Sequence, residues 1–121
     1  MNMAQHNDLG KKGEDLAVEF LVKNNYQILR RNYRFEKAEV DIIAQKEATL
    51  IVVEVKTRTT RDFGNPEEFL RPKQIQNLVK AIDAYITEND IDLDIRFDVI
   101  AIILEKHVCE IEHIEDAFYH F

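Results

Sequence analysis

The chain has 121 residues, of which 45% are hydrophobic and 32% charged, a balance that excludes a disordered or membrane-embedded protein. The formal net charge of −7 is unevenly spread, because residues 1–80 carry +2 and residues 81–121 carry −9. Local patches govern binding, so the acidic total does not exclude a nucleic-acid partner for the first two thirds. The alternative interpretation is that the acidic residues of the final third only aid solubility.

The cysteine count and the apolar runs indicate a cytoplasmic protein. Cys109 has no partner for an internal disulfide, and no Cys/His cluster is present to bind zinc. We expect it to be a small buried hydrophobe in a reducing compartment. The longest apolar run, Val99–Leu104, is far too short to span a bilayer. We therefore predict one cytoplasmic domain over residues 1–121.

The hydrophobic pattern predicts two helices and five strands in the order α-β-β-β-α-β-β. Apolar residues recur at helical spacing in the first helix, and Pro72 suits the first position of the second. This order is typical of an α/β layer architecture with a mixed sheet. The expected elements are a helix over about residues 8–24, strands Tyr26–Arg34, Glu39–Gln45 and Leu50–Thr57, a loop over Arg58–Phe69, a helix from Pro72, and strands Ile95–Leu104 and His107–Ile111.

The second and third strands are predicted to form a hairpin with one apolar and one charged face. Side chains on a strand alternate between faces. Glu39, Asp41, Glu54 and Lys56 then share the charged face, together with Ile43 and Val52. The apolar face would hold Val40, Ile42, Ala44, Ile51, Val53 and Val55.

A turn that is symmetric about Glu47–Ala48 fixes the register of this hairpin. Asp41 then lies opposite Glu54, and Glu39 lies opposite Lys56. Directly opposed side chains have Cβ atoms ~4.5–5.5 Å apart, so two carboxylates repel each other there. A divalent cation would compensate both charges, since Mg²⁺ uses one or two carboxylates together with water and substrate phosphate.

The pattern Asp-x(n)-Glu-x-Lys therefore indicates phosphodiester hydrolysis. A metal held by Asp41 and Glu54 would polarise phosphate and activate water. Lys56 would hold the water nucleophile or stabilise negative charge that builds up on phosphate. The alternative is a solvent-facing strand surface on which Lys56 forms cross-strand salt bridges.

Several spaced segments carry a resemblance over roughly Gly10 to Ile111. They are Gly13–Ala17, Arg31–Arg34, Glu39–Ile43, Val53–Arg58, Phe63–Pro66, Lys73 and Arg96–Ile100. In this order they resemble the YraN-like family of small bacterial proteins, whose fold is similar to archaeal Holliday-junction resolvases and restriction endonucleases of the PD-(D/E)xK nuclease superfamily. Ala38 and Val52 depart from residues frequent in that family, but neither change removes a catalytic group.

The resemblance implies a restriction-endonuclease-like α-β-β-β-α-β core, with a mixed central sheet flanked by helices. It also implies roles for four residues. Asp41 and Glu54 would bind Mg²⁺ or Mn²⁺, Lys56 would be the catalytic lysine, and Glu14 would assist the metal site. The resemblance does not define the substrate, of which branched DNA is one candidate, and by analogy with resolvases we expect a homodimer.

Basic residues suit contact with a nucleic-acid backbone. We expect Arg31, Arg34, Arg58 and Lys73 to bind phosphate, with a solvated polar surface as the alternative.

Two carboxylates are ambiguous in the sequence. Glu14 borders the apolar face of the first helix, where it either points toward the sheet or is an exposed first-turn residue favoured by the helix dipole. Asp98 lies in an apolar strand, and a buried carboxylate needs a partner. We expect Arg96 to supply it in a structural role, and no histidine pairs with a nucleophile.

Three functions follow from these residues. The first is a metal-dependent nuclease that hydrolyses DNA phosphodiesters, centred on Asp41, Glu54 and Lys56. The second is a catalytically silent nucleic-acid-binding module with a nuclease fold. The third is an interaction protein that engages a partner through its acidic final third.

Overall fold

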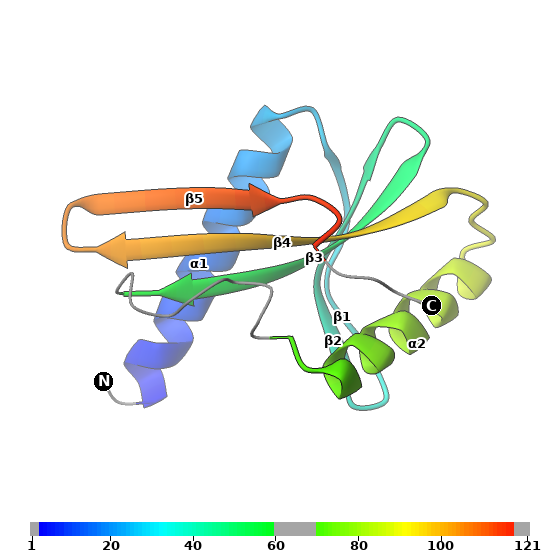
Figure 1. Ribbon diagram of the computed structural model, residues 1–121, viewed down its shortest axis with the longest axis horizontal. Coiled ribbons are helices and arrows are strands. Elements are labelled where there is room, and N and C mark those ends of the chain that lie inside the picture. Colours follow the sequence, from blue (N-terminus) through cyan, green and yellow to red (C-terminus); the bar gives the residue numbers. More distant parts are fainter. Residues whose placement is uncertain (1–2, 60–69, 118–121) are drawn as a thin grey trace.

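The chain folds into two helices and five strands in the predicted order α-β-β-β-α-β-β, which is confirmed (Figure 1). The computed structural model describes residues 3–59 and 70–117, with side chains from Asp8 onward. Most of the predicted Arg58–Phe69 loop lies outside the described residues. The elements are α1 (Met3–Lys23), β1 (Gln27–Phe35), β2 (Ala38–Lys46), β3 (Thr49–Arg58), α2 (Pro72–Glu88), β4 (Asp94–Glu105) and β5 (Val108–Ile114).

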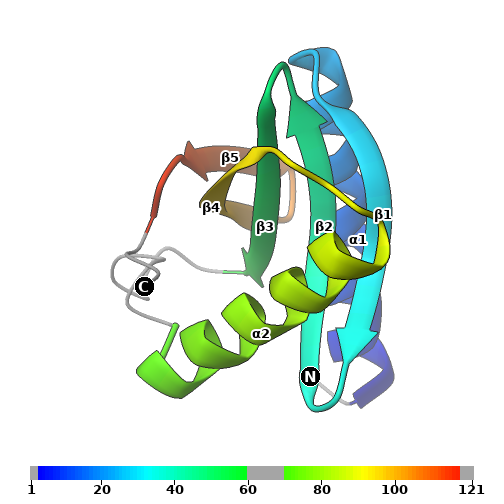
Figure 2. The same ribbon diagram turned by 90° about the vertical axis from the view of Figure 1, so that its right-hand side faces the viewer.

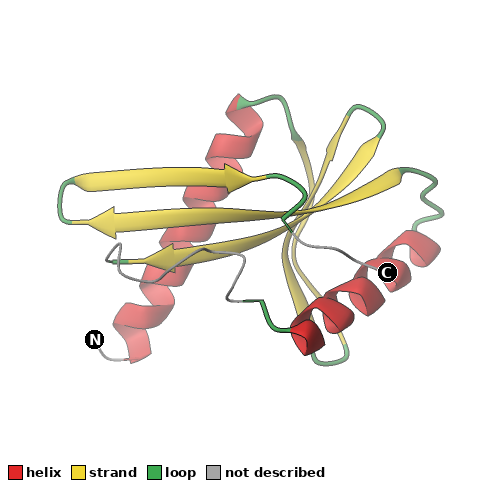
Figure 3. Cartoon of the chain, viewed as in Figure 1, coloured by secondary structure: helices red, strands yellow, loops and turns green. Residues whose placement is uncertain are grey.

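The five strands form one mixed sheet in the order β1-β2-β3-β4-β5. β3 and β4 are parallel and all other neighbours are antiparallel. Parallel neighbours need a crossover connection, which α2 supplies between β3 and β4. Figures 2 and 3 show α1 and α2 on opposite faces of the sheet. In the described chain, neither helix has the length and apolar character needed to cross a lipid bilayer.

Each helix covers its own hydrophobic cluster. Ala17 and Leu21 of α1 pack with Ile51 on one face, while Leu78 and Ile82 of α2 pack with the other. Both faces of the central strands are therefore buried.

The predicted faces of the hairpin are wrong at Val40, and the face that was predicted to be charged is apolar at Ile43 and Val52. Val40 packs on the α2 side, whereas Ile42 and Ala44 pack on the α1 side, so alternation is interrupted at Asp41. Ile43, which was predicted to share the charged face, is buried under α2. Sheet twist and irregular backbone break a strict two-residue period, which sequence alternation cannot show.

The predicted register of the β2–β3 hairpin is confirmed. Ile42 pairs with Val53 and Ile43 with Val52, as a turn centred on Glu47–Ala48 requires. This ladder ends at Ile42 and Val53, so it includes neither the predicted pairing of Asp41 with Glu54 nor that of Glu39 with Lys56. Beyond that point β2 pairs with β1 alone, while β3 continues along β4, and Figure 1 shows the two halves of the sheet diverging.

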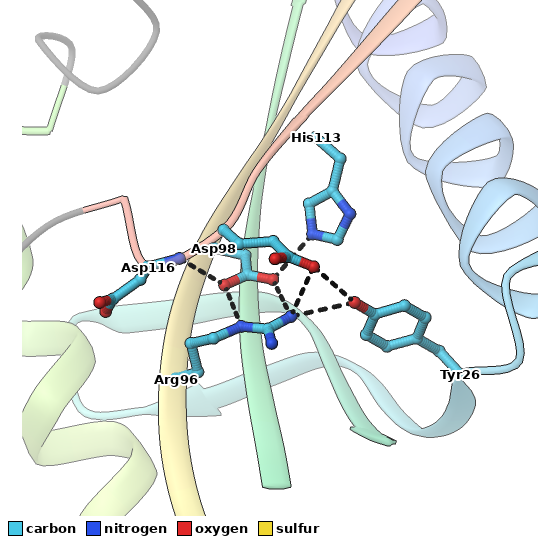
Figure 4. A network of polar contacts seen from close by, with 6 residues as sticks. Tyr26, Arg96, Asp98, His113 and Asp116 are labelled. Atoms are coloured by element: carbon cyan, nitrogen blue, oxygen red, sulfur yellow. Dashed lines mark hydrogen bonds and ion pairs between the residues drawn. The ribbon is translucent and has the colours of Figure 1, made fainter. Parts of the chain in front are cut away.

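A polar network joins β4 to the end of β5 (Figure 4). Asp98 is fully buried, and the Arg96 guanidinium donates to both of its oxygens at 2.9 and 2.8 Å. The predicted Arg96–Asp98 pairing is thus confirmed. His113 Nε2 lies 2.7 Å from Asp98 Oδ2, and the Asp116 backbone N–H donates to Oδ1 at 3.0 Å.

The predicted burial of Cys109 is wrong, because this residue is exposed. It lies on the edge strand β5 beside Val108 and Glu110, which are also exposed. Figure 1 shows this end of the β4–β5 hairpin projecting past α1. An alternating pattern on an edge strand does not require that a helix covers either side.

Asp98→Ala should lower the free energy of unfolding by about 3–5 kcal/mol, because it removes the buried acceptor that Arg96, His113 and the Asp116 backbone N–H share. Asp94→Ala is the matched control on the same strand. Its carboxylate is exposed, so the change should be below about 0.5 kcal/mol. Urea denaturation of both variants measures the difference. Equal, small losses would contradict a stabilising role for this network.

The stabilisation by Asp98 should depend on pH. Burial alone would raise the pKa of Asp98, but hydrogen bonds from His113, Arg96 and the Asp116 amide hold it below its ordinary value. The contribution is therefore complete above the unfolded pKa near ~4 and is lost as pH falls through the lower folded pKa. The stability difference between wild type and Asp98→Ala should shrink over that range. A constant difference would contradict the lowered pKa.

Candidate functional site

Two carboxylates meet where the β2–β3 ladder ends. The Asp41 backbone N–H donates to Glu54 Oε1 at 3.4 Å. The Val55 backbone N–H donates to Asp41 Oδ2 at 2.8 Å. Each carboxylate therefore bonds to the backbone of the other strand, in the place of ordinary ladder bonds. This arrangement holds Asp41 and Glu54 side by side, as the hairpin register predicted.

The surroundings of this pair disfavour two negative charges. Burial raises the pKa of Glu54 above its ordinary value, and the charge of Asp41 raises it further. Burial likewise raises the pKa of Asp41, with smaller contributions from Glu14 and Glu39. Removing a carboxylate from water costs free energy unless a charge or hydrogen bonds compensate it. The pair is therefore a place where a cation would be strongly stabilised.

Lys56 is the nearest compensating charge on β3. Its positive charge opposes the rise in the pKa of both Asp41 and Glu54. Among the residues that the structure describes, no carboxylate lies within salt-bridge distance of its ammonium. The alternative of cross-strand salt bridges at Lys56 therefore does not hold for this part of the chain. Lys56 is instead one of the residues that line a cavity.

The cavity has a volume of about 930 Å³ and is lined by α1, β1, β2 and β3. Asp41 and Lys56 lie in its wall, and Glu14 enters from α1. The Glu14 side chain is 14% exposed, so the helix carboxylate points toward the sheet and not into bulk solvent. Four elements thus converge on the diverging ends of β2 and β3.

Gly13 allows α1 to come this close. A Cβ atom built on Gly13 would collide with the side chain of Thr57, next to Lys56. Any larger residue would therefore push the helix away from β3. The neighbouring Glu14 would move with it, so the glycine sets the distance between Glu14 and the strand ends.

Glu14 is held by two consecutive residues of β1. The Arg31 guanidinium donates to Glu14 Oε1 at 3.4 Å, and also to Asp15 Oδ1 at 2.6 Å. The Asn32 amide donates to Glu14 Oε2 at 3.1 Å and to Glu39 Oε1 at 3.2 Å. The sequence analysis assigned no role to Asp15 or Asn32. The residue type of Asn32 is the one indication of its role in the sequence, because asparagine tolerates a left-handed backbone. The residues around it, however, predict a regular strand.

Three of the four predicted phosphate-binding residues line the cavity. Arg31, Arg34 and Arg58 lie at its rim, together with Lys11, which the sequence analysis did not single out. The Arg34 side chain is 78% exposed and lies 3.6 Å from Glu39 Oε2. Lys73 is exposed on the first turn of α2 and is not among the lining residues.

The donor set fits a hard cation with few protein ligands. In residues 3–59 and 70–117, no group of three or more His, Cys, Asp or Glu side chains is arranged to hold a metal. Zinc sites use three or four such ligands, whereas Mg²⁺ is often held by one or two carboxylates that leave room for water and phosphate. Asp41 and Glu54 beside an open cavity match the second pattern.

Comparison with known proteins identifies the family. The sequence profile of the uncharacterised protein family UPF0102 matches residues 13–102. The chain belongs to this family. The matched region holds Glu14, Asp41, Glu54 and Lys56, and it ends within β4. The predicted membership of the YraN-like family is thereby confirmed, while the similarity to the nuclease superfamily stays a prediction.

Relatives within UPF0102 match almost the full chain. The UPF0102 protein of Flavobacterium psychrophilum is 61% identical over 119 residues, covering 98% of this chain and all of the relative. The protein of Christiangramia forsetii is 60% identical with the same coverage. That of Phocaeicola vulgatus is 45% identical over 117 residues, or 97% of each chain. The names of these relatives state no activity.

Gly13→Ala should destabilise the protein by about 1–3 kcal/mol, because the added methyl group meets Thr57 in a packed contact. Gly10→Ala is a matched control on the same helix, where an added Cβ meets no described atom within 4 Å. Alanine favours a helix over glycine, so this variant should gain up to about 1 kcal/mol. Chemical denaturation measures both changes. Equal stabilisation by the two alanines would contradict the close approach of α1.

Proposed function

We propose that this UPF0102 protein is a divalent-metal-dependent nuclease that hydrolyses DNA phosphodiester bonds through a restriction-endonuclease-like site. The observation that carries the proposal is the pair of Asp41 and Glu54, of which Asp41 lines the cavity together with Lys56 and several arginines, while Glu54 lies behind it, in hydrogen-bond contact with the Asp41 backbone. A pair of carboxylates that do not readily ionise together favours a bound metal ion, and the basic side chains next to it favour a phosphate.

Each residue then has a distinct task. Asp41 and Glu54 would hold Mg²⁺ or Mn²⁺, which when bound polarises phosphate and lowers the pKa of water. Lys56 would stabilise the negative charge that develops on phosphate, since this residue lines the cavity. Glu14, close enough to Asp41 to raise its pKa, would add to the negative field that attracts the metal.

The rim residues would select the substrate by its backbone. Arg31, Arg34 and Arg58 come from two strands and border one cavity. Contacts of arginine with phosphate position a nucleic acid without reading its sequence. The protein would therefore recognise the shape of the backbone, and branched DNA is the expected substrate.

A second candidate is a nucleic-acid-binding module without catalysis. It is favoured by Arg31, Arg34 and Arg58, which line the cavity and would contact phosphate with or without a metal. Such a module would use the same basic rim and would bind DNA equally well without metal.

Cleavage of labelled DNA in Mn²⁺ tests the nuclease directly. Four-way-junction, flap, duplex and single-stranded substrates would be compared, with EDTA added in parallel. Lys56→Ala should lower the cleavage rate by about 10²–10³, the typical cost of losing one group that stabilises transition-state charge. Lys80→Ala is the matched control, because Lys80 is an exposed lysine on α2 outside the cavity.

The outcomes separate the candidates. Cleavage that is lost with EDTA and in Lys56→Ala, but kept in Lys80→Ala, supports the nuclease. Tight metal-independent binding with no cleavage of any substrate favours the binding module. The homodimer expected from the family resemblance stays a prediction, which light scattering tests.

A further inference from the structure

Asn32 interrupts the regular geometry of β1 beside the proposed site. Its φ of 52° places it in the left-handed region, which asparagine tolerates better than most residues. Consecutive strand residues normally point to opposite faces, yet Arg31 and Asn32 both bond to Glu14. Tyr33 then packs against the α2 side. The left-handed residue therefore turns two neighbouring side chains toward one carboxylate.

The Asn32 amide joins two carboxylates from different elements. Its Nδ2 donates to Glu14 Oε2 on α1 at 3.1 Å and to Glu39 Oε1 on β2 at 3.2 Å. A primary amide has two N–H donors, so both are used. Without these two N–H donors, the negative charges of Glu14 and Glu39 would be less well compensated, and their repulsion would move the two side chains apart. The neutral amide of Asn32 thus fixes α1 relative to β2. On β2 its contact is Glu39, which lies two residues before Asp41.

We propose that Asn32 is a positioning residue that holds Glu14 and Glu39 as an outer pair of carboxylates around the metal held by Asp41 and Glu54. This inference rests on the proposed function. Asn32 bonds to neither Asp41 nor Glu54, so it acts through Glu14 and Glu39. Groups that orient a metal site from outside the ligands set its affinity, and their loss typically weakens binding about 10–100-fold.

The test is Mn²⁺ binding measured by calorimetry on the full chain. Asn32→Gly keeps the left-handed backbone, because glycine adopts it freely, and removes only the amide. Its affinity for Mn²⁺ should fall about 10-fold. Asn25→Gly is the matched control, because Asn25 also has a positive φ, of 70°, but lies in the turn after α1. Its Mn²⁺ affinity should equal that of wild type.

A double-mutant cycle shows whether Asn32 acts through Glu14. Asn32→Gly should cause little further loss of affinity in a Glu14→Gln background, since coupled residues are not additive. Asn32→Ala removes the same amide but strains the backbone, so it should match Asn32→Gly in affinity and have a lower Tm.

Other results would overturn the inference. Unchanged affinity in Asn32→Gly, or fully additive losses with Glu14→Gln, would contradict positioning through Glu14. Unfolding of both the glycine and the alanine variant would make Asn32 a general structural residue. No Mn²⁺ binding by wild type would overturn the proposed metal site itself, and this inference with it.

Discussion

The site depends on the repulsion between two carboxylates, Asp41 and Glu54, that lie close together and are largely shielded from water. Asp41 and Glu54 are forced together because the β2–β3 ladder ends between them and each accepts a hydrogen bond from the other strand's backbone. Burial raises the pKa of both carboxylates, and the charge of Asp41 raises the pKa of Glu54 further. The surrounding features reduce this repulsion or exploit it. Lys56 brings a positive charge, and Gly13 brings α1 close enough to complete the cavity.

The core of the site could be predicted from the sequence because it is local. A short symmetric turn fixes the register of a hairpin, and the observed pairing of Ile43 with Val52 agrees with it. That register alone brings Asp41 near Glu54. The direction of Glu14 could not be decided, because it depends on how closely α1 packs on β3. Only the structure shows the contact at Gly13 that settles it.

The rest could not be read from the pattern because it depends on long-range or irregular geometry. Strict alternation misplaced Val40, since the face changes at Asp41. Asn32 was passed over because a left-handed residue inside a strand leaves no periodic signal. His113 gave no indication of a partner, because it meets Asp98 only when β5 returns along β4. The spacing of apolar residues thus predicts the helices and strands and their order. Polar contacts between elements that are distant in the sequence can be seen only in the structure.

The central claim is that the carboxylate pair holds a divalent cation. The most direct measurement is anomalous X-ray diffraction from crystals of the protein grown with Mn²⁺. The account predicts an anomalous peak in contact with both Asp41 and Glu54, on the cavity side near Lys56. No peak at that place, with both carboxylates ordered in the positions described above, would contradict the account.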